Sequence, residues 1–174
     1  MSNVIANFEK VSKEQYFEDF KNLYPNIEYT NEVINDVIGI WEQIKLPKRS
    51  DPGSAGYDFY CNFPIINIEA HKPIVIPTGI RCKMDNDYVL LLVPRSGMGF
   101  KYGMHLYNTV GVIDSSYYNA KNEGHIMAKF VTEENGLTIN AGDRFMQGIF
   151  VPYGITTDDD ASGERTGGFG SSGN

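Results

Sequence analysis

The 174-residue sequence lacks long apolar runs, since no stretch approaches the roughly 18 apolar residues that a membrane span requires. Its first residues, MSNVIANFEKVSKEQ, also lack the basic and then apolar order of a signal peptide. We therefore expect a cytoplasmic protein without a membrane partner. An apolar content of 41% and a charged content of 21% fit one globular domain, or one domain with an appendage.

Positive charge is scarce, because 15 lysines and arginines face 22 acidic residues and leave a net charge of −7. Phosphate backbones are bound by basic surfaces, so we expect no nucleic-acid partner. The net charge does not exclude a small anionic ligand, provided that lysines or arginines lie close together in one site.

Cysteine is scarce as well. Cys61 and Cys82 stand in expected strands, without a CxxC motif or a histidine at metal-ligand spacing, which predicts buried, reduced thiols.

Several catalytic motifs are absent. The sequence contains no GxxxxGK[ST] loop, and no GxGxxG opens a helix. Its three histidines, His71, His105 and His125, are scattered and form no Ser-His-Asp set. We therefore expect no nucleophilic triad chemistry.

Residues 1–46 differ from the rest of the chain and predict an N-terminal helical extension. Ser12 is a candidate N-cap, with Gln15 three residues later as in a capping box, and aromatic residues follow at helical spacing. A second amphipathic helix is expected after Thr30 or Asn31 and before Pro47.

Residues 47–155 consist of short runs rich in Val, Ile, Phe and Tyr, separated by Gly, Pro, Asn and Asp. Strands of this length and spacing predict an all-β sandwich or barrel. Apolar runs then stop, and residues 156–174 are expected to form a flexible C-terminal arm.

Three of the five arginines stand beside glycines: Arg95 in PRSGMG, Arg144 in AGDRFMQG and Arg165 in RTGGFG. Guanidinium forks and nearby backbone amides suit a polyphosphate, although each arginine taken alone could be a surface charge. Asp58 and Asp114 interrupt apolar segments. Each needs donors, a metal shell or a catalytic task, unless it is solvated at a strand end.

Five motifs in order resemble those of the trimeric, all-β deoxyuridine triphosphate nucleotidohydrolases, the dUTPases. They are AGYDFY (55–60), PRSGMGFKYG (94–103), NTVGVIDSSYY (108–118), GDRFMQG (142–148) and RTGGFGSSG (165–173). The resemblance covers roughly residues 46–174 and implies a distorted β-barrel of jelly-roll type.

The resemblance implies hydrolysis of dUTP to dUMP and pyrophosphate. Asp114 would activate the water that attacks the α-phosphorus, and Tyr117 would lie under the sugar and exclude a ribose 2′-hydroxyl. The residues implied in binding deoxyuridine are Asn108, Gly111, Ile113, Asp114, Tyr117 and Phe169.

Phosphate contacts implied by the resemblance involve Arg95, Ser96, Gly97, Gln147, Arg165, Ser171 and Ser172. Mg²⁺ would be held mostly by phosphate oxygens and waters, and Asp58 would reach its shell through water. The family forms homotrimers with sites between subunits, where the tail of one chain closes a site built by the others.

Two segments depart from the family pattern. The turn after Tyr117, in YNAKNEGHI, is longer than usual, and residues 1–46 match nothing in the minimal enzyme. The extension could be a helical pair packed on the barrel, a cover for the trimer surface or a docking site for another protein. Two other functions stay open: a dCTP deaminase, whose second PRS-segment arginine is missing here, and a nucleotide-responsive interaction protein.

Overall fold

The computed structural model of the chain describes residues 4–163 and residue 167. Both predicted helices are present near the N-terminus, as α1 (Lys13–Leu23) and α2 (Asn31–Glu42). The Ser12 hydroxyl accepts a hydrogen bond from the Gln15 amide, and the Thr30 hydroxyl accepts one from the Val33 amide. Local capping chemistry therefore starts both helices where the sequence predicts.

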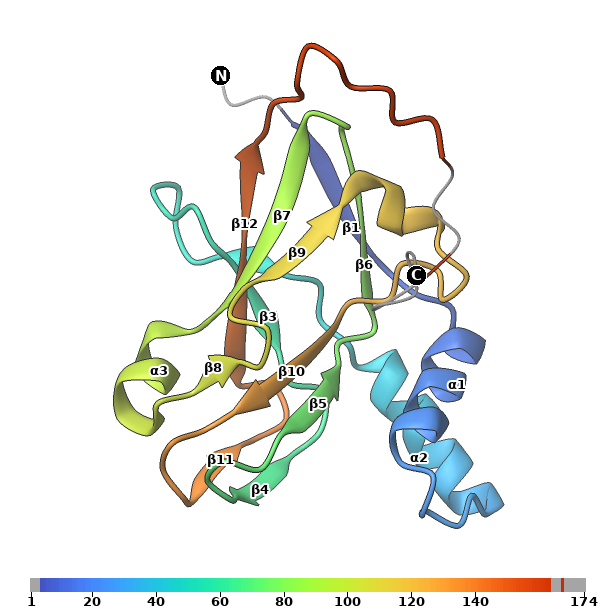
Figure 1. Cartoon of the computed structure of the whole chain (residues 1–174). Helices are drawn as coiled ribbons and strands as arrows, with labels where there is room; N and C mark the ends of the chain where they lie inside the picture. The colour runs from blue at the N-terminus through green and yellow to red at the C-terminus, as the bar shows by residue number, and fades with distance from the viewer. Residues whose placement is uncertain (1–3, 164–166, 168–174) are drawn as a thin grey trace.

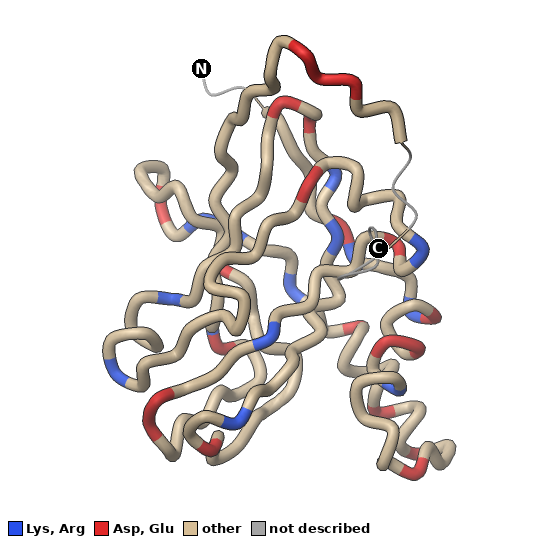
Figure 2. The backbone as a smooth tube through the Cα atoms, in the orientation of Figure 1, with Lys and Arg blue, Asp and Glu red and all other residues tan. Residues whose placement is uncertain are grey.

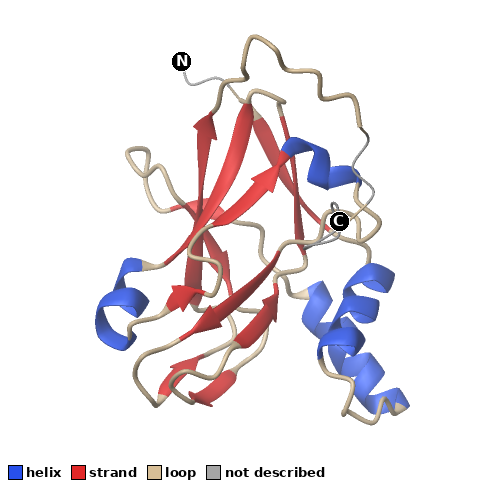
Figure 3. Ribbon diagram, viewed as in Figure 1, coloured by secondary structure: helices blue, strands red, loops and turns tan. Residues whose placement is uncertain are grey.

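The rest of the described chain is built mainly from strands (Figures 1 and 3). They are β1 (Ala6–Lys10), β2 (Lys48–Arg49), β3 (Tyr57–Tyr60), β4 (Ile65–Ile68), β5 (Ile74–Pro77), β6 (Ile80–Met84), β7 (Tyr88–Pro94), β8 (His105–Leu106), β9 (Gly111–Asp114), β10 (Met127–Val131), β11 (Leu137–Ile139) and β12 (Arg144–Pro152). A short helix α3 (Ser96–Tyr102) follows β7, and a 3-10 helix η1 (Ser115–Asn119) follows β9.

Strand pairing confirms the predicted all-β core and fits the jelly-roll type. Within the described residues the strands form four sheets rather than one closed barrel: β2-β3-β12-β7-β9, β5-β10-β8, β11-β4 and β1-β6. All pairs between these strands are antiparallel.

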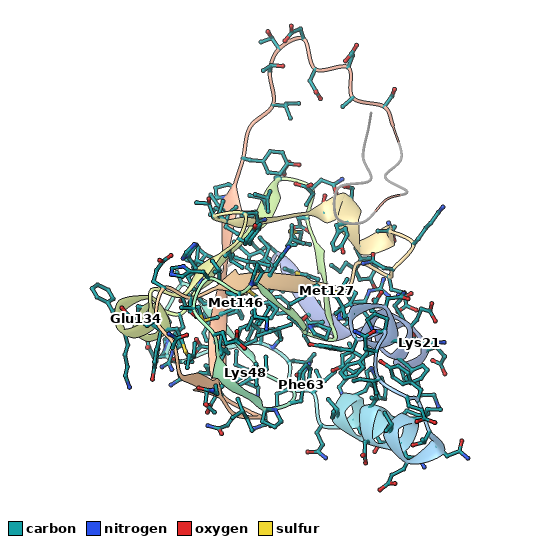
Figure 4. The ribbon with its side chains drawn as sticks, turned by 60° about the horizontal axis from the view of Figure 1, so that its bottom comes forward. Lys21, Lys48, Phe63, Met127, Glu134 and Met146 are labelled. Atoms are coloured by element: carbon teal, nitrogen blue, oxygen red, sulfur yellow. The ribbon has the colours of Figure 1, made fainter. Side chains whose placement is uncertain are left out.

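Aromatic and aliphatic side chains from facing strands fill the core. Phe130 and Phe145 are fully buried, and their rings meet edge to face with centroids 5.4 Å apart. Met146 lies in the middle of the molecule, whereas Lys21 and Glu134 lie at its edges (Figure 4). Alternate residues of the strands thus supply the interior, as the period of a strand requires.

The N-terminal segment shares this core. Strand β1 pairs with β6. The sequence did not predict this strand, because ANFEK has no β-branched residue and becomes a strand only by pairing with β6. On α1, Tyr16 is fully buried, and the indole N–H of Trp41 donates to the Val11 carbonyl at 2.9 Å. This favours a helical pair packed on the β core, while the boundaries at residues 46 and 155 stay predictions.

Residues of both charge signs are interspersed along the described chain, and Asp158, Asp159 and Asp160 form an acidic stretch after β12 (Figure 2). None of the helices in the described ranges has the length and apolar content that crossing a bilayer would take.

Both cysteines are free and buried, as the sequence predicts. Burial raises the pKa of the Cys61 thiol to about 11 and that of the Cys82 thiol to about 12. The thiolate that reacts with electrophiles is therefore suppressed in the folded protein.

We expect neither thiol to react with an aromatic disulfide reagent at about pH 8 while the protein is folded, because both are protonated and inaccessible. Denaturant should release both thiols at once, measured by absorbance of the released thiolate. A thiol that reacts rapidly without denaturant would contradict the burial of Cys61, which directly follows β3, or of Cys82 in β6.

Candidate active site

One sheet aligns four of the five sequence motifs. Its central strand β12 pairs with β3 on one side and with β7 on the other, so that Gln147 faces both Asp58 and Val93. Strand β7 then pairs with β9, which places Leu92 opposite Gly111. The order β3-β12-β7-β9 therefore sets the first, fourth, second and third motifs side by side (Figure 1).

The second motif turns from β7 into α3. The Arg95 amide donates to the Phe145 carbonyl at 3.1 Å, which ties the turn to β12. Ser96 and Gly97 are exposed in the first turn of α3, where backbone N–H groups have no intrahelical acceptor. The arrangement offers one guanidinium, one hydroxyl and backbone donors in a short segment, as a polyphosphate would need.

A polar cavity of about 480 Å³ lies beside this turn. It is lined by Tyr60, Arg95, Met98, Gly142, Asp143 and Arg144. Arg95 and Arg144, predicted from separate motifs, thus contribute to the same cavity. Tyr60 and Asp143 were not predicted as site residues, although they lie within the motifs AGYDFY and GDRFMQG.

Asp58 forms an ion pair with Arg144. The Arg144 guanidinium donates to its Oδ2 atom at 3.0 Å, and the Ser50 hydroxyl donates to the same atom at 3.1 Å. Since Asp58 is 7% exposed, this pairing satisfies a carboxylate that would be costly to bury alone. Among residues 4–163 and 167, no group of three or more His, Cys, Asp or Glu side chains could hold a metal.

An apolar cavity of about 480 Å³ lies along the connection between β8 and β9. Asn108, Gly111 and Ile113 line it, together with Leu92 and Ala128. A Cβ atom on Gly111 would stand 2.9 Å from Leu92 Cβ, so only glycine allows this approach of β9 to β7. The cavity thus brings together three of the predicted deoxyuridine residues and suits a flat, weakly polar ring.

The other two third-motif residues do not line this cavity. Asp114 ends β9 opposite Val89 and leads into η1. Tyr117 is 2% exposed, and its hydroxyl donates to the His125 carbonyl at 2.8 Å and accepts from the Asn122 amide at 2.8 Å. The predicted contact between Tyr117 and a sugar stays a prediction.

Asp114 and Arg95 are far apart within one chain. Asp114 lies opposite Val89, and Arg95 follows Val89 by six residues along β7, which corresponds to about 20 Å of strand. A base and a phosphate ligand for the same reaction would need to lie within a few ångströms of one substrate. Arg165, Phe169, Ser171 and Ser172 lie outside the described residues.

Fold and cavities together define a class: a jelly-roll-type β protein with one polar cavity lined by arginines and one separate apolar cavity that suits a flat ring. The comparisons with known proteins specify the family. The sequence profile of the dUTPase family matches residues 42–173. The chain therefore belongs to the dUTPase family.

Two individual relatives support membership of the dUTPase family. The deoxyuridine 5′-triphosphate nucleotidohydrolase of Lactococcus lactis subsp. lactis is 41% identical over 136 residues, which are 75% of this chain and 89% of the relative. The enzyme of the same name from Haemophilus ducreyi is 37% identical over 142 residues, covering 77% and 90%.

Solved structures show the same fold. The crystal structure of dUTPase from Streptococcus mutans matches with a TM-score of 0.63 and 32% identity, over 86% of this chain and 98% of that one. A mutant dUTPase from phage phi11 of S. aureus, described as coordinating a structural Mg(II) ion, matches with a TM-score of 0.55 and 24% identity, over 71% and 92%.

Replacing Arg144 by methionine should lower the free energy of unfolding by about 1–3 kcal/mol, because it leaves the buried Asp58 carboxylate without its charged partner. The measurement is urea denaturation without magnesium. The matched control is Arg49→Met, since Arg49 is exposed and donates to the neutral carbonyls of Pro52 and Ser54. Equal losses in the two variants would contradict the structural role of the pair.

Proposed function

We propose that this chain hydrolyses dUTP to dUMP and pyrophosphate, as a dUTP diphosphatase. The observation that carries the proposal is the register of one sheet, which aligns β3, β12, β7 and β9 and with them four motifs of the family. Membership of the dUTPase family over residues 42–173 and the activity named for its relatives support it.

The apolar cavity would hold the base. Asn108 and the hairpin backbone as far as Gly111 and Ile113 would pair with the uracil edge, and a wrong hydrogen-bonding pattern would leave buried groups unpaired. Phe169 would stack on the ring from the C-terminal arm. Tyr117, held within η1, would limit the room at the 2′ position of the sugar.

Asp114 would act as the general base. Its carboxylate at the end of β9 would take a proton from the water that attacks the α-phosphorus, and it would also contact the 3′-hydroxyl. Pyrophosphate then leaves as the bond from the α-phosphorus to the bridging oxygen breaks. Charge on this leaving group would be stabilised by Arg95, Ser96, Gly97 and Gln147, and by Arg165, Ser171 and Ser172 from the arm.

Mg²⁺ would serve as the cofactor by neutralising phosphate charge. The donor set fits an ion carried mainly by the substrate, because the described residues form no carboxylate cage and Asp58 is paired with Arg144. Asp58 would then reach the hydrated ion only through water.

A homotrimer with shared sites is the assembly that we propose. The separation of about 20 Å between Asp114 and Arg95 along β7 is too long for one triphosphate contact set, so Arg95 of another copy would complete each site. The polar cavity and the apolar cavity of one chain would then belong to different sites. A cytoplasmic location and a further protein partner for residues 1–46 stay hypotheses.

Pyrophosphate release should be fast with dUTP and Mg²⁺ and much slower with dCTP, dTTP and UTP. Asp114→Asn should lower kcat on dUTP by about 10²–10⁴-fold, because the amide cannot accept the proton of the attacking water. Asp36→Asn, an exposed carboxylate on α2, is the control and should match the wild type. Similar rates on all four nucleotides, or an unaffected Asp114→Asn variant, would refute the function.

Truncation after Asp160 removes the fifth motif. We expect a folded oligomer that still binds dUTP weakly but hydrolyses it poorly, because arginine and aromatic contacts from the arm are lost. Calorimetric titration with a non-hydrolysable dUTP analogue and turnover measurements separate binding from chemistry. Full turnover by the shortened chain would rule out a closing role for the arm.

A further inference from the structure

The two segments that depart from the family pattern meet in space. One is the chain before residue 42, where the family match begins, and the other is the lengthened turn 119–125 after Tyr117. Hydrogen bonds of 2.6 to 2.7 Å connect the N-terminal segment with the chain from Tyr118 to His125. These contacts tie the N-terminal segment to the turn that follows Tyr117.

Glu123 forms the first connection. Its carboxylate accepts from the Ser12 amide and from the Ser12 hydroxyl, both at 2.7 Å, at the N-terminus of α1. Glu123 adopts φ of 57°, and the following Gly124 has φ of 70°. A Cβ atom on Gly124 would lie 2.7 Å from the Tyr117 carbonyl oxygen, so the turn is pressed onto η1.

Tyr118 forms the second connection. Its hydroxyl donates to Glu9 of β1 at 2.7 Å, and this hydrogen bond raises the pKa of the phenol. Arg81 of β6 lies over the Tyr118 ring at 3.6 Å and donates to the Tyr118 carbonyl at 3.1 Å. The side chain of Tyr118 is thus fixed between the first strand and its partner.

His125 and Asp19 form the third and most buried connection. The Gly79 amide donates to Nε2 of His125 at 2.8 Å, so this nitrogen carries no proton. Nδ1 must then hold the proton of the neutral ring and donate it to Asp19 at 2.6 Å. Gln15 donates to the same carboxylate oxygen at 3.0 Å, so α1 supplies both the acceptor and its support.

The backbone of His125 leads directly to Tyr117. The His125 carbonyl accepts from the Tyr117 hydroxyl at 2.8 Å, and Asn122 of the same turn donates to that hydroxyl at 2.8 Å. A continuous chain of contacts therefore runs from Asp19 on α1 through His125 to Tyr117. Since η1 begins directly after Asp114, the same turn also supports the end of β9.

We propose that Asp19 and His125 are positioning residues which hold Tyr117, and that the N-terminal segment thereby sets the discrimination between deoxyribose and ribose nucleotides. This inference rests on the proposed function. A Tyr117 ring held in place through its hydroxyl would leave no room for a 2′-hydroxyl, whereas a ring that can shift would admit one. Loss of the Asp19 contact should thus raise acceptance of UTP more than it lowers the rate on dUTP.

The experiment compares Asp19→Ala with Asp19→Asn, whose side-chain oxygen can still accept from His125 Nδ1. We expect the ratio of kcat/KM for dUTP to that for UTP to fall by about 10-fold to 100-fold in Asp19→Ala, and Asn to restore most of it. Glu18→Ala is the matched control, since Glu18 is the exposed neighbour on α1. It should keep the wild-type ratio.

A purely structural role predicts a different result. If Asp19→Ala lowers the free energy of unfolding while the dUTP to UTP ratio stays at the wild-type value, the proposal is overturned. Should Asp19→Ala fail to fold, Glu123→Gln tests the same turn through its Ser12 contact, and a smaller fall in the same ratio is expected. An unchanged ratio in that variant would count equally against the proposal.

Amide hydrogen exchange separates this inference from the proposed function. Exchange at residues 115–125 should accelerate in Asp19→Ala and stay at the wild-type rate in Glu18→Ala, whatever reaction the protein catalyses. A wild-type protein that hydrolyses no dUTP would refute the proposed function and with it the nucleotide discrimination, while the exchange result would still decide whether Asp19 and His125 hold Tyr117. Unchanged exchange in Asp19→Ala would refute the positioning role alone.

Discussion

Backbone pairing of β12 on both of its edges is the constraint on which the rest of the structure depends. Its register with β3 and β7 places Gln147 beside Asp58 and brings the Arg95 turn against Phe145. Gly148 makes this close packing possible, because a Cβ atom there would stand 2.8 Å from the Leu90 side chain. A shift by one residue would turn the buried side chains outward and misplace every motif along the sheet.

An ion pair adds to the backbone pairing between β3 and β12. The Asp58 carboxylate is buried beside Arg144, so the first and fourth motifs are joined by an ion pair as well as by the β3-β12 ladder. Arg95 lines the polar cavity together with Arg144 of this pair. Local positive charge can thus gather on a chain whose net charge is −7.

The N-terminal segment is part of this structure rather than an attachment to it. Tyr16 of α1 lies in the common core, and β1 adds a strand to β6. Asp19 satisfies a histidine that would otherwise bury an unpaired N–H group. Packing of the added helices and order in the turn after Tyr117 therefore depend on each other.

Sequence alone determined the elements whose causes are local. Ser12 and Thr30 start helices through bonds to residues three positions ahead, and the five motifs identified the family because residue types and order suffice for that. Tertiary structure decided the strand state of β1, the Asp58–Arg144 pair across 86 residues and the Asp19–His125 contact across 106 residues. No local pattern marks such partners, because their pairing energy exists only once the folded chain has brought them together and removed water.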